Sequence, residues 1–181
     1  HKFVIIRLVS WKASHDIGHK GFSLEYLKRL IELVEDHSRV FLSVEGEIPA
    51  QLEKYKLPID PTEIHNILYY AELFIGEGAT MASECAVLGT PSIYVNSLSA
   101  GSLENQAKEN LIHMFNSTDG VIEKVEEILK NDNYKTQQKI MRDKALEKKV
   151  DVNKFMEWFI LNYPNSYEKI KENPSLQYEI K

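Results

Sequence analysis

The chain has 181 residues, 43% of them hydrophobic, which is enough to bury a sizeable core and argues against a mainly disordered protein. Its net charge of -5 gives no basic surface for nucleic acid or an anionic membrane, and no apolar run is long enough to span a bilayer. The single cysteine, Cys85, has no partner for an internal disulfide. We therefore expect a cytoplasmic protein with one domain, or one domain and an appendage, and neither nucleic acid nor a membrane as partner.

The first third of the chain predicts alternating strands and helices. It begins with His1 and enters an apolar run at once, so we expect the sequence to start at a domain boundary inside a longer protein. The patterns predict a buried strand at 3–9, a helix at 23–35 capped by Ser23, a strand at 40–44 and a short helix at 51–55.

The alternation continues to about residue 130. A helix is predicted to begin at Pro61 with Asp60 as its cap, and it is followed by a strand at 73–75 and a glycine turn at 76–80. A helix at 81–88 then ends at Gly89, and a strand follows at 91–95. Helices at 103–109 and 119–130 flank a last strand at 111–115. The sheet should have five or six strands.

From residue 134 onward only helices are predicted. Residues 137–149 form a charged helix, residues 152–160 carry an apolar stripe, and the polar tail after Pro164 is treated as a peripheral appendage. We therefore divide the chain into an α/β domain at 1–133 and a helical carboxyl-terminal extension at 134–181. The extension is expected to pack on that domain or on a missing partner domain.

These patterns predict an α/β fold, a Rossmann-like doubly wound parallel sheet covered by helices on both faces. Ligands of such sheets bind outside the carboxyl ends of the strands. Two loops of this sequence lie at such ends, one after the strand at 3–9 and one after the strand at 73–75.

The glycine turn after the strand at 73–75 is the first candidate site. Gly76 and Gly78 let the backbone turn tightly and approach a ligand, and the helix that follows presents free amides suited to an anion. The alternative is a plain strand-to-helix turn with Thr80 as the helix cap. Glu84 lies one turn further, where its carboxylate can accept hydrogen bonds from ribose hydroxyls or merely complement the helix dipole.

Residues 76–91, GEGATMASECAVLGTP, resemble the donor-site segment of GT-B glycosyltransferases and of the related UDP-GlcNAc 2-epimerases. Residues 3–96, including WKASHDIG at 11–18, are similar to the carboxyl-terminal half of the DUF354 family of GT-B-like proteins, and more distantly to MurG-like transferases. The resemblance implies one half of a GT-B fold, with Glu84 on the ribose and the amides of Gly78, Ala79 and Thr80 on the phosphates. The site residues that it implies in this segment are Gly76, Glu77, Gly78, Ala79, Thr80, Ser83 and Glu84.

The loop after the first strand is the second candidate site. Its donors, acceptors and one aromatic ring suit a sugar diphosphate, although an ordinary solvated loop is the alternative. This loop lacks the glycine-rich turn that many GT-B members, including MurG-like transferases, carry there. A metal site at His15 and His19 is disfavoured, because Gly18 opposes a helix between them and no third ligand is evident. The candidates here are Trp11, Lys12, Ser14, His15 and Asp16, and Asn96 joins them from the end of the strand at 91–95.

The resemblance implies a domain that binds a nucleotide-diphosphate sugar, expected to be a UDP-sugar, with no cofactor and no metal. Its catalytic partner would be its own missing amino-terminal domain, so this part alone should be inactive and no catalytic base is named. An epimerase-like enzyme is the first alternative, with Glu77 as the carboxylate near the sugar carbon. The second is a binding or scaffolding domain without turnover, which the absent glycine-rich turn favours.

Overall fold

A computed structural model describes residues 1–9, 22–46, 48–98 and 101–180. The chain divides into two compact units, His1–Arg142 and Asp143–Lys181, which are described separately below.

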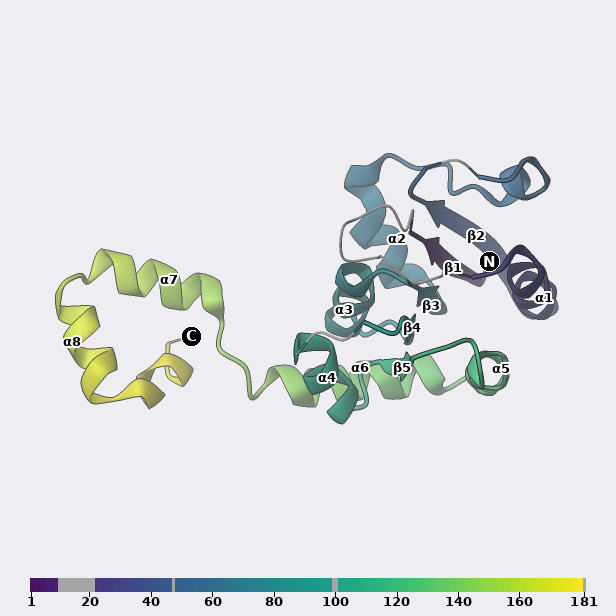
Figure 1. Cartoon of the computed structure of the whole chain (residues 1–181). Coiled ribbons are helices and arrows are strands. Elements are labelled where there is room, and N and C mark those ends of the chain that lie inside the picture. Colours follow the sequence, from purple (N-terminus) through teal and green to yellow (C-terminus); the bar gives the residue numbers. More distant parts are fainter. Residues whose placement is uncertain (10–21, 47, 99–100, 181) are drawn as a thin grey trace. The chain divides into compact units, whose positions relative to one another are not determined.

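The first unit is built on a five-stranded parallel sheet (Figure 1). The strands stand in the order β2-β1-β3-β4-β5. Their bounds are β1 Phe3–Leu8, β2 Arg39–Val44, β3 Leu73–Gly76, β4 Ser92–Val95 and β5 His113–Phe115. The α/β fold with a Rossmann-like parallel sheet that the sequence predicts is confirmed.

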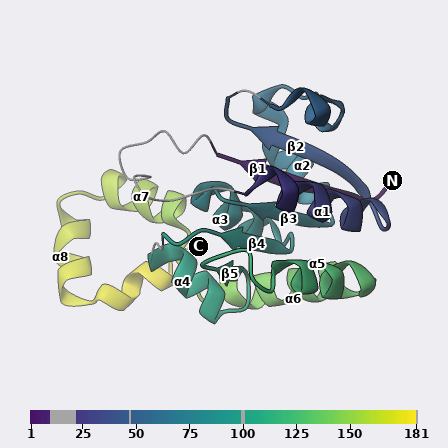
Figure 2. The same cartoon turned by 45° about the vertical axis from the view of Figure 1, so that its right-hand side comes forward.

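Helices connect successive strands and cover the sheet. The helix α1 packs against β2 and α5, whereas α3 packs against β3, β4, α2 and α4. The views in Figures 1 and 2 show these two groups of helices around the strands. Their bounds are α1 Leu24–Glu35, η2 Ala50–Tyr55, η3 Pro61–Glu63, α2 Ile64–Tyr70, α3 Ala79–Leu88, α4 Gly101–Lys108, α5 Val121–Lys130 and α6 Tyr134–Leu146.

The core lies on both sides of the sheet because side chains alternate along each strand. Val4 and Ile75 belong to one buried cluster with Leu30 of α1 and Val125 of α5. The ring of Phe74, also fully buried, points to the opposite side. A sheet buried on both faces explains why its strands read as nearly continuous apolar runs.

Several helix ends lie where the sequence places them. The Ser23 hydroxyl accepts a hydrogen bond from the Tyr26 amide at 3.1 Å, and Asp60 accepts one from the Thr62 amide at 2.9 Å. Gly89 ends α3 with a φ of 76°, the left-handed conformation that glycine adopts without strain. These predicted caps are confirmed.

The strand order creates a topological switch point between β1 and β3. From β1 the chain crosses to β2 on one side, and it later returns to place β3 on the other side of β1. The connections that leave the carboxyl ends of β1 and β3 therefore run to opposite faces, which opens a crevice at this edge. Both candidate loops begin here, one after Leu8 and the other after Gly76.

The second unit is helical. It contains α7 Val152–Leu161, α8 Asn165–Glu172 and the short η4 Pro174–Tyr178, so the polar tail after Pro164 is also largely helical. Asp151 caps α7 by accepting from the Lys154 amide at 3.1 Å. The helix α6 begins where the sequence places the extension, but its residues up to Arg142 group with the first unit. No helix in either unit, as far as the chain is described, has the length and apolar character to cross a membrane.

Candidate functional site

The glycine turn after β3 begins at a position where only glycine fits. A Cβ atom on Gly76 would lie 2.6 Å from Cζ of Phe74 and 2.9 Å from Cβ of Arg7. Gly78 is different, because a Cβ atom there would meet Cγ1 of Val9 at an ordinary 3.5 Å and its φ of -91° suits any residue. The protein's own packing therefore requires Gly76 but not Gly78.

The helix α3 starts at Ala79, two residues earlier than predicted, and its cap is Gly78. The alternative that makes Thr80 the cap is therefore wrong. Thr80 is already inside the first turn, and glycine has no side chain to accept from the helix amides. Within the described residues, the amides of 78–81 donate no hydrogen bond to the protein, the first being that of Ala82 to the Gly78 carbonyl at 3.3 Å. The turn thus presents unpaired donors at the switch point.

Glu77 lies inside the protein beneath this turn and is 3% exposed. Its Oε2 atom accepts from the Val9 amide at 3.1 Å, and its Oε1 atom accepts from the Phe22 amide at 2.5 Å. Both carboxylate oxygens are therefore used by the backbone at the two flanks of residues 10–21. Glu77 therefore joins the turn after β3 to the end of β1 and to the residue before the cap of α1.

Asn96, just beyond β4, is joined to the same turn. Its Nδ2 atom donates to the Glu77 carbonyl at 3.0 Å, and its Oδ1 atom accepts from the Leu98 amide at 2.9 Å. The structure thus brings Asn96 next to Glu77, and its side chain connects the end of β4 to the turn after β3.

Glu84 is partly exposed on α3, where it faces His65 of α2. The Nε2 atom of His65 is 3.4 Å from Oε1 of Glu84. The first turn of α3 contains no acidic residue, and Glu84 lies beyond it, so the helix-dipole interpretation of Glu84 is weakened because that effect fades within the first turn. Thr80 is exposed one turn before Glu84. His65 lies on another helix, so no local pattern in the sequence pointed to this neighbour.

Ser83 and Cys85 also lie on α3. The carbonyl of Ser83 accepts from Nε2 of Gln106 at 3.3 Å, which ties α3 to α4. Cys85 is fully buried, and burial, followed by the charge of Glu84, raises the pKa of its thiol, so it stays neutral. The predicted residues Trp11, Lys12, Ser14, His15 and Asp16 lie outside the described residues.

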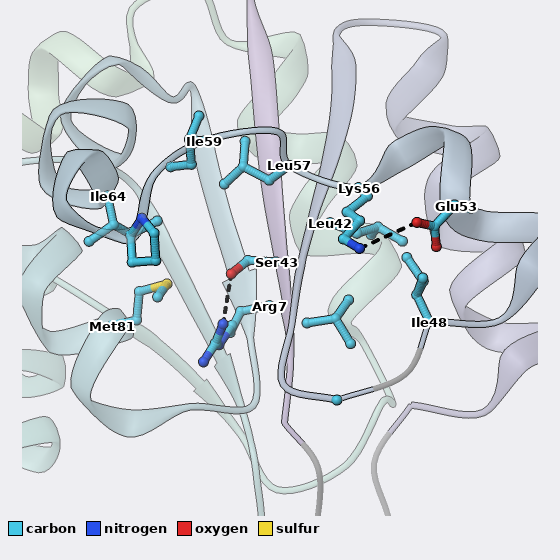
Figure 3. A pocket seen from close by; sticks show the side chains of 13 residues that line it. Arg7, Leu42, Ser43, Ile48, Glu53, Lys56, Leu57, Ile59, Ile64 and Met81 are labelled. Carbon is cyan, nitrogen blue, oxygen red and sulfur yellow. Dashed lines mark hydrogen bonds and ion pairs between the residues drawn. The ribbon is translucent and has the colours of Figure 1, made fainter.

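A pocket of about 700 Å3 opens beside the first turn of α3 (Figure 3). Met81 of α3 and Ile64 of α2 lie on one side of it, and Ile48 lies across from them. Its remaining walls come mainly from β2 and from the segment between η2 and α2. They include Leu42, Val44, Leu57, Ile59 and Pro61, with Glu53 and Lys56 at the polar margin.

Arg7, near the end of β1, also lines this pocket. Its Nη1 atom donates to the Ser43 hydroxyl at 2.7 Å, and its Nη2 atom pairs with Glu45. A guanidinium has five N–H donors, so donors remain for a ligand. Sequence reasoning missed Arg7, although its position at the carboxyl end of the first strand was a usable signal. In the described chain, no group of three His, Cys, Asp or Glu residues is arranged to hold a metal.

Comparisons with known proteins find one matching family and several solved structures with a similar fold. The model of a family described as "Protein of unknown function (DUF354)" matches residues 19–163. A search of curated proteins finds no match.

Among solved structures, the chain is similar to a "putative UDP-N-acetylglucosamine 2-epimerase from Listeria monocytogenes". The two are 13% identical, and the match has a TM-score of 0.53 and covers 76% of this chain and 39% of that one. It is similar to the wall teichoic acid polymerase TagF at 13% identity, with a TM-score of 0.55 over 93% of this chain and 45% of that one. The glycotransferase of kitacinnamycin matches at 14% identity with a TM-score of 0.49, over 79% and 38% of the two chains. This chain spans less than half the length of each, and the first two support a common fold.

Proposed function

The chain belongs to the DUF354 family, and we propose that it binds a nucleoside-diphosphate sugar, with a UDP-sugar as the expected ligand, as the donor-binding half of a glycosyltransferase-like protein. One observation carries the proposal. The amides at the start of α3, which have no partner among the described residues, lie at the switch point of the sheet and adjoin a pocket of about 700 Å3 that is large enough for a nucleoside.

The diphosphate is assigned to the amides at the start of α3. Backbone N–H groups and the helix dipole both favour an anion there, and Gly78 leaves the approach open because it has no Cβ atom. Among the described residues, the amide of Met81 has no hydrogen-bond partner, like those of Gly78, Ala79 and Thr80. The donor set is therefore one amide larger than the sequence implies.

The ribose is assigned to Glu84. A carboxylate accepts two hydrogen bonds from vicinal hydroxyls, and Glu84 stands one turn beyond Thr80 on the exposed part of α3. His65, 3.4 Å from its carboxylate, is close enough to orient it.

The base is assigned to the pocket of Figure 3. Aliphatic side chains from β2 and α2 and from Met81 provide apolar contact for a planar ring, and Arg7 can donate to its carbonyl oxygens. A donor at this position suits a base with several acceptors, such as uracil.

No catalytic residue for sugar transfer is assigned to this chain. Trp11, Lys12, Ser14, His15 and Asp16 remain predicted contacts to the sugar diphosphate, and the acceptor site and general base are expected on an amino-terminal domain of the full protein. The epimerase-like alternative relies on Glu77, whose buried carboxylate already accepts from two backbone amides, and this observation disfavours Glu77 as a proton carrier.

Calorimetric titration with UDP, GDP and inorganic diphosphate tests the proposal. Replacing Glu84 with alanine should weaken UDP binding by roughly 10- to 100-fold, because hydrogen bonds to a charged group contribute about 1.5 to 3 kcal/mol. Inorganic diphosphate has no ribose, so its affinity should change by no more than about threefold, equivalent to about 0.7 kcal/mol.

Glu32→Ala provides the matched control, because Glu32 is an exposed helical glutamate on α1. No binding of any nucleotide to the unmodified chain would reject the proposal in favour of a scaffolding domain. An equal loss of UDP and diphosphate in Glu84→Ala would reject the ribose assignment alone.

A further inference from the structure

The carboxylate of Glu77 connects parts of the chain that are far apart in sequence. Val9 and Phe22, whose amides it receives, lie 68 and 55 residues before it. The Glu77 amide itself donates to the Arg7 carbonyl at 3.3 Å. One residue thus fixes the end of β1, the approach to α1 and the turn that leads into α3.

The network extends to β4 and β5 through Asn96. The Asn96 side chain donates to the Glu77 carbonyl at 3.0 Å, and its own amide donates to the Phe115 carbonyl at 2.9 Å. Four of the five strand ends at this edge are therefore linked around Glu77 and Asn96.

The choice of glutamate at this position has an electrostatic cost for an anion site. A buried negative charge directly before the cap of α3 repels an anion bound at that helix terminus. Glutamine has the same size and no charge, but only one of its terminal atoms is an acceptor. Here the two backbone amides donate to different oxygens of the side chain, an arrangement that a carboxylate allows and a glutamine amide does not.

We propose that Glu77 is a positioning residue that holds Val9 and Phe22 in a fixed arrangement about the amino terminus of α3, and that this arrangement is required for diphosphate binding. The requirement for diphosphate binding rests on the proposed function, whereas the positioning of Val9 and Phe22 does not. Glu77 acts through the backbone that it holds, and no proton transfer is assigned to it.

The variant Glu77→Gln separates this role from simple repulsion by sign. If the charge of Glu77 acts only by repulsion, its removal should tighten inorganic diphosphate binding. If Glu77 positions the site, one amide loses its acceptor and faces an NH2 group, so we expect diphosphate affinity to fall by about tenfold, equivalent to 1.4 kcal/mol. Glu72→Gln removes the same charge just before the other end of β3 and provides the control.

Hydrogen exchange on the ligand-free chain tests independently whether Glu77 holds Val9 and Phe22 in place. The Val9 and Phe22 amides should exchange slowly in the unmodified protein, and at least one should exchange about tenfold or more faster in Glu77→Gln. Unchanged exchange at both amides overturns the positioning role, and tighter diphosphate binding overturns its link to the ligand. If the unmodified chain binds no diphosphate, the proposed function fails while the exchange result still decides the role of Glu77.

Should Glu77→Gln not fold, the unmodified protein provides the readout. Its Val9 and Phe22 amides should both exchange slowly, because each donates to a carboxylate oxygen of the buried Glu77. Fast exchange of either amide in the unmodified protein would overturn the proposal.

Discussion

Gly76 and Gly78 lie on either side of Glu77. The close packing around Gly76 indicates that the fold requires a glycine there, whereas the space around Gly78 indicates that a glycine there serves the ligand. Gly76→Ala forces a Cβ atom within 3 Å of both Phe74 and Arg7, so we expect it to lower the free energy of unfolding by about 2 to 3 kcal/mol. Gly78→Ala meets only ordinary contacts, and its effect on unfolding should stay within about 1 kcal/mol.

The order of the two variants should be reversed for diphosphate affinity, with Gly78→Ala the more strongly affected. A methyl group on Gly78 narrows the approach to the unpaired amides of α3, so diphosphate affinity should fall about tenfold in a protein that remains folded. Urea unfolding and calorimetry on both variants make the comparison. Full diphosphate affinity in Gly78→Ala would mean that the anion approaches the helix from elsewhere.

Individual residues show where sequence reasoning ends. Ser23 and Asp60 were identifiable as caps because each bonds an amide within three residues of itself. The partners of Glu77 are 55 and 68 residues away, and the partner of Glu84 is on another helix, so neither contact has a local pattern. The glutamate positions were predicted, but the difference in their burial was not.

At the scale of elements, the contact between β5 and α6 should make stability depend on pH. The Nε2 atom of His113 is 2.6 Å from the hydroxyl of Tyr134, and burial, followed by the charge of Lys124, lowers the pKa of His113. A lowered pKa means that the folded protein favours the neutral ring. This contribution is complete above the unfolded pKa of about 6.5 and is lost as the pH falls through the folded pKa.

Urea unfolding at pH 7.5 and at lower pH values measures this effect. The free energy of unfolding should decline less with acidification in His113→Gln than in the unmodified chain, because glutamine has no proton to gain. Other groups titrate in both proteins, so the difference between the two curves isolates His113. Parallel curves would show that the ring titrates alike in the folded and unfolded chains.

Elements were predictable where a pattern is repeated and less so at their ends. The alternation of apolar runs gave all five strands, because a parallel sheet buries both faces. The start of α3 was placed two residues late because Thr80 is a strong cap by type, yet the chain enters the helix already at Gly78. That shift matters for function, since it moves Thr80 into the first turn and leaves the helix without a side-chain cap.

For the whole molecule, strand alternation predicted the fold class, but strand order decides where a ligand can bind. The switch point follows from β3 lying beside β1, a pairing between residues about 70 positions apart. The pocket likewise needs β2, α2 and α3 to meet, which no single stretch of sequence encodes. The sequence therefore identified two loops at strand ends, and the pocket became visible only in three dimensions.

The boundary between the sheet domain and the helical extension remains a prediction, and two truncations test it. A chain ending at residue 133, the predicted boundary, lacks Gln138, which is 1% exposed and whose Nε2 atom donates to the carbonyls of Asn110 and Leu111. It also lacks Lys139, whose ammonium lies 4.5 Å from the ring centre of Tyr69. We expect this chain to lose at least about 2 kcal/mol of unfolding free energy relative to one ending at residue 149.

The chain ending at 149 should also bind UDP as the full sequence does, because the start of α3, Glu84 and the pocket all lie within His1–Arg142. Thermal unfolding and calorimetry on the two truncations decide between the boundaries. Equal stability of both chains would place the boundary at 133 and reduce α6 to an accessory helix. If the chain that ends at residue 149 is as stable as expected but does not bind UDP, residues 150–181 are required for binding.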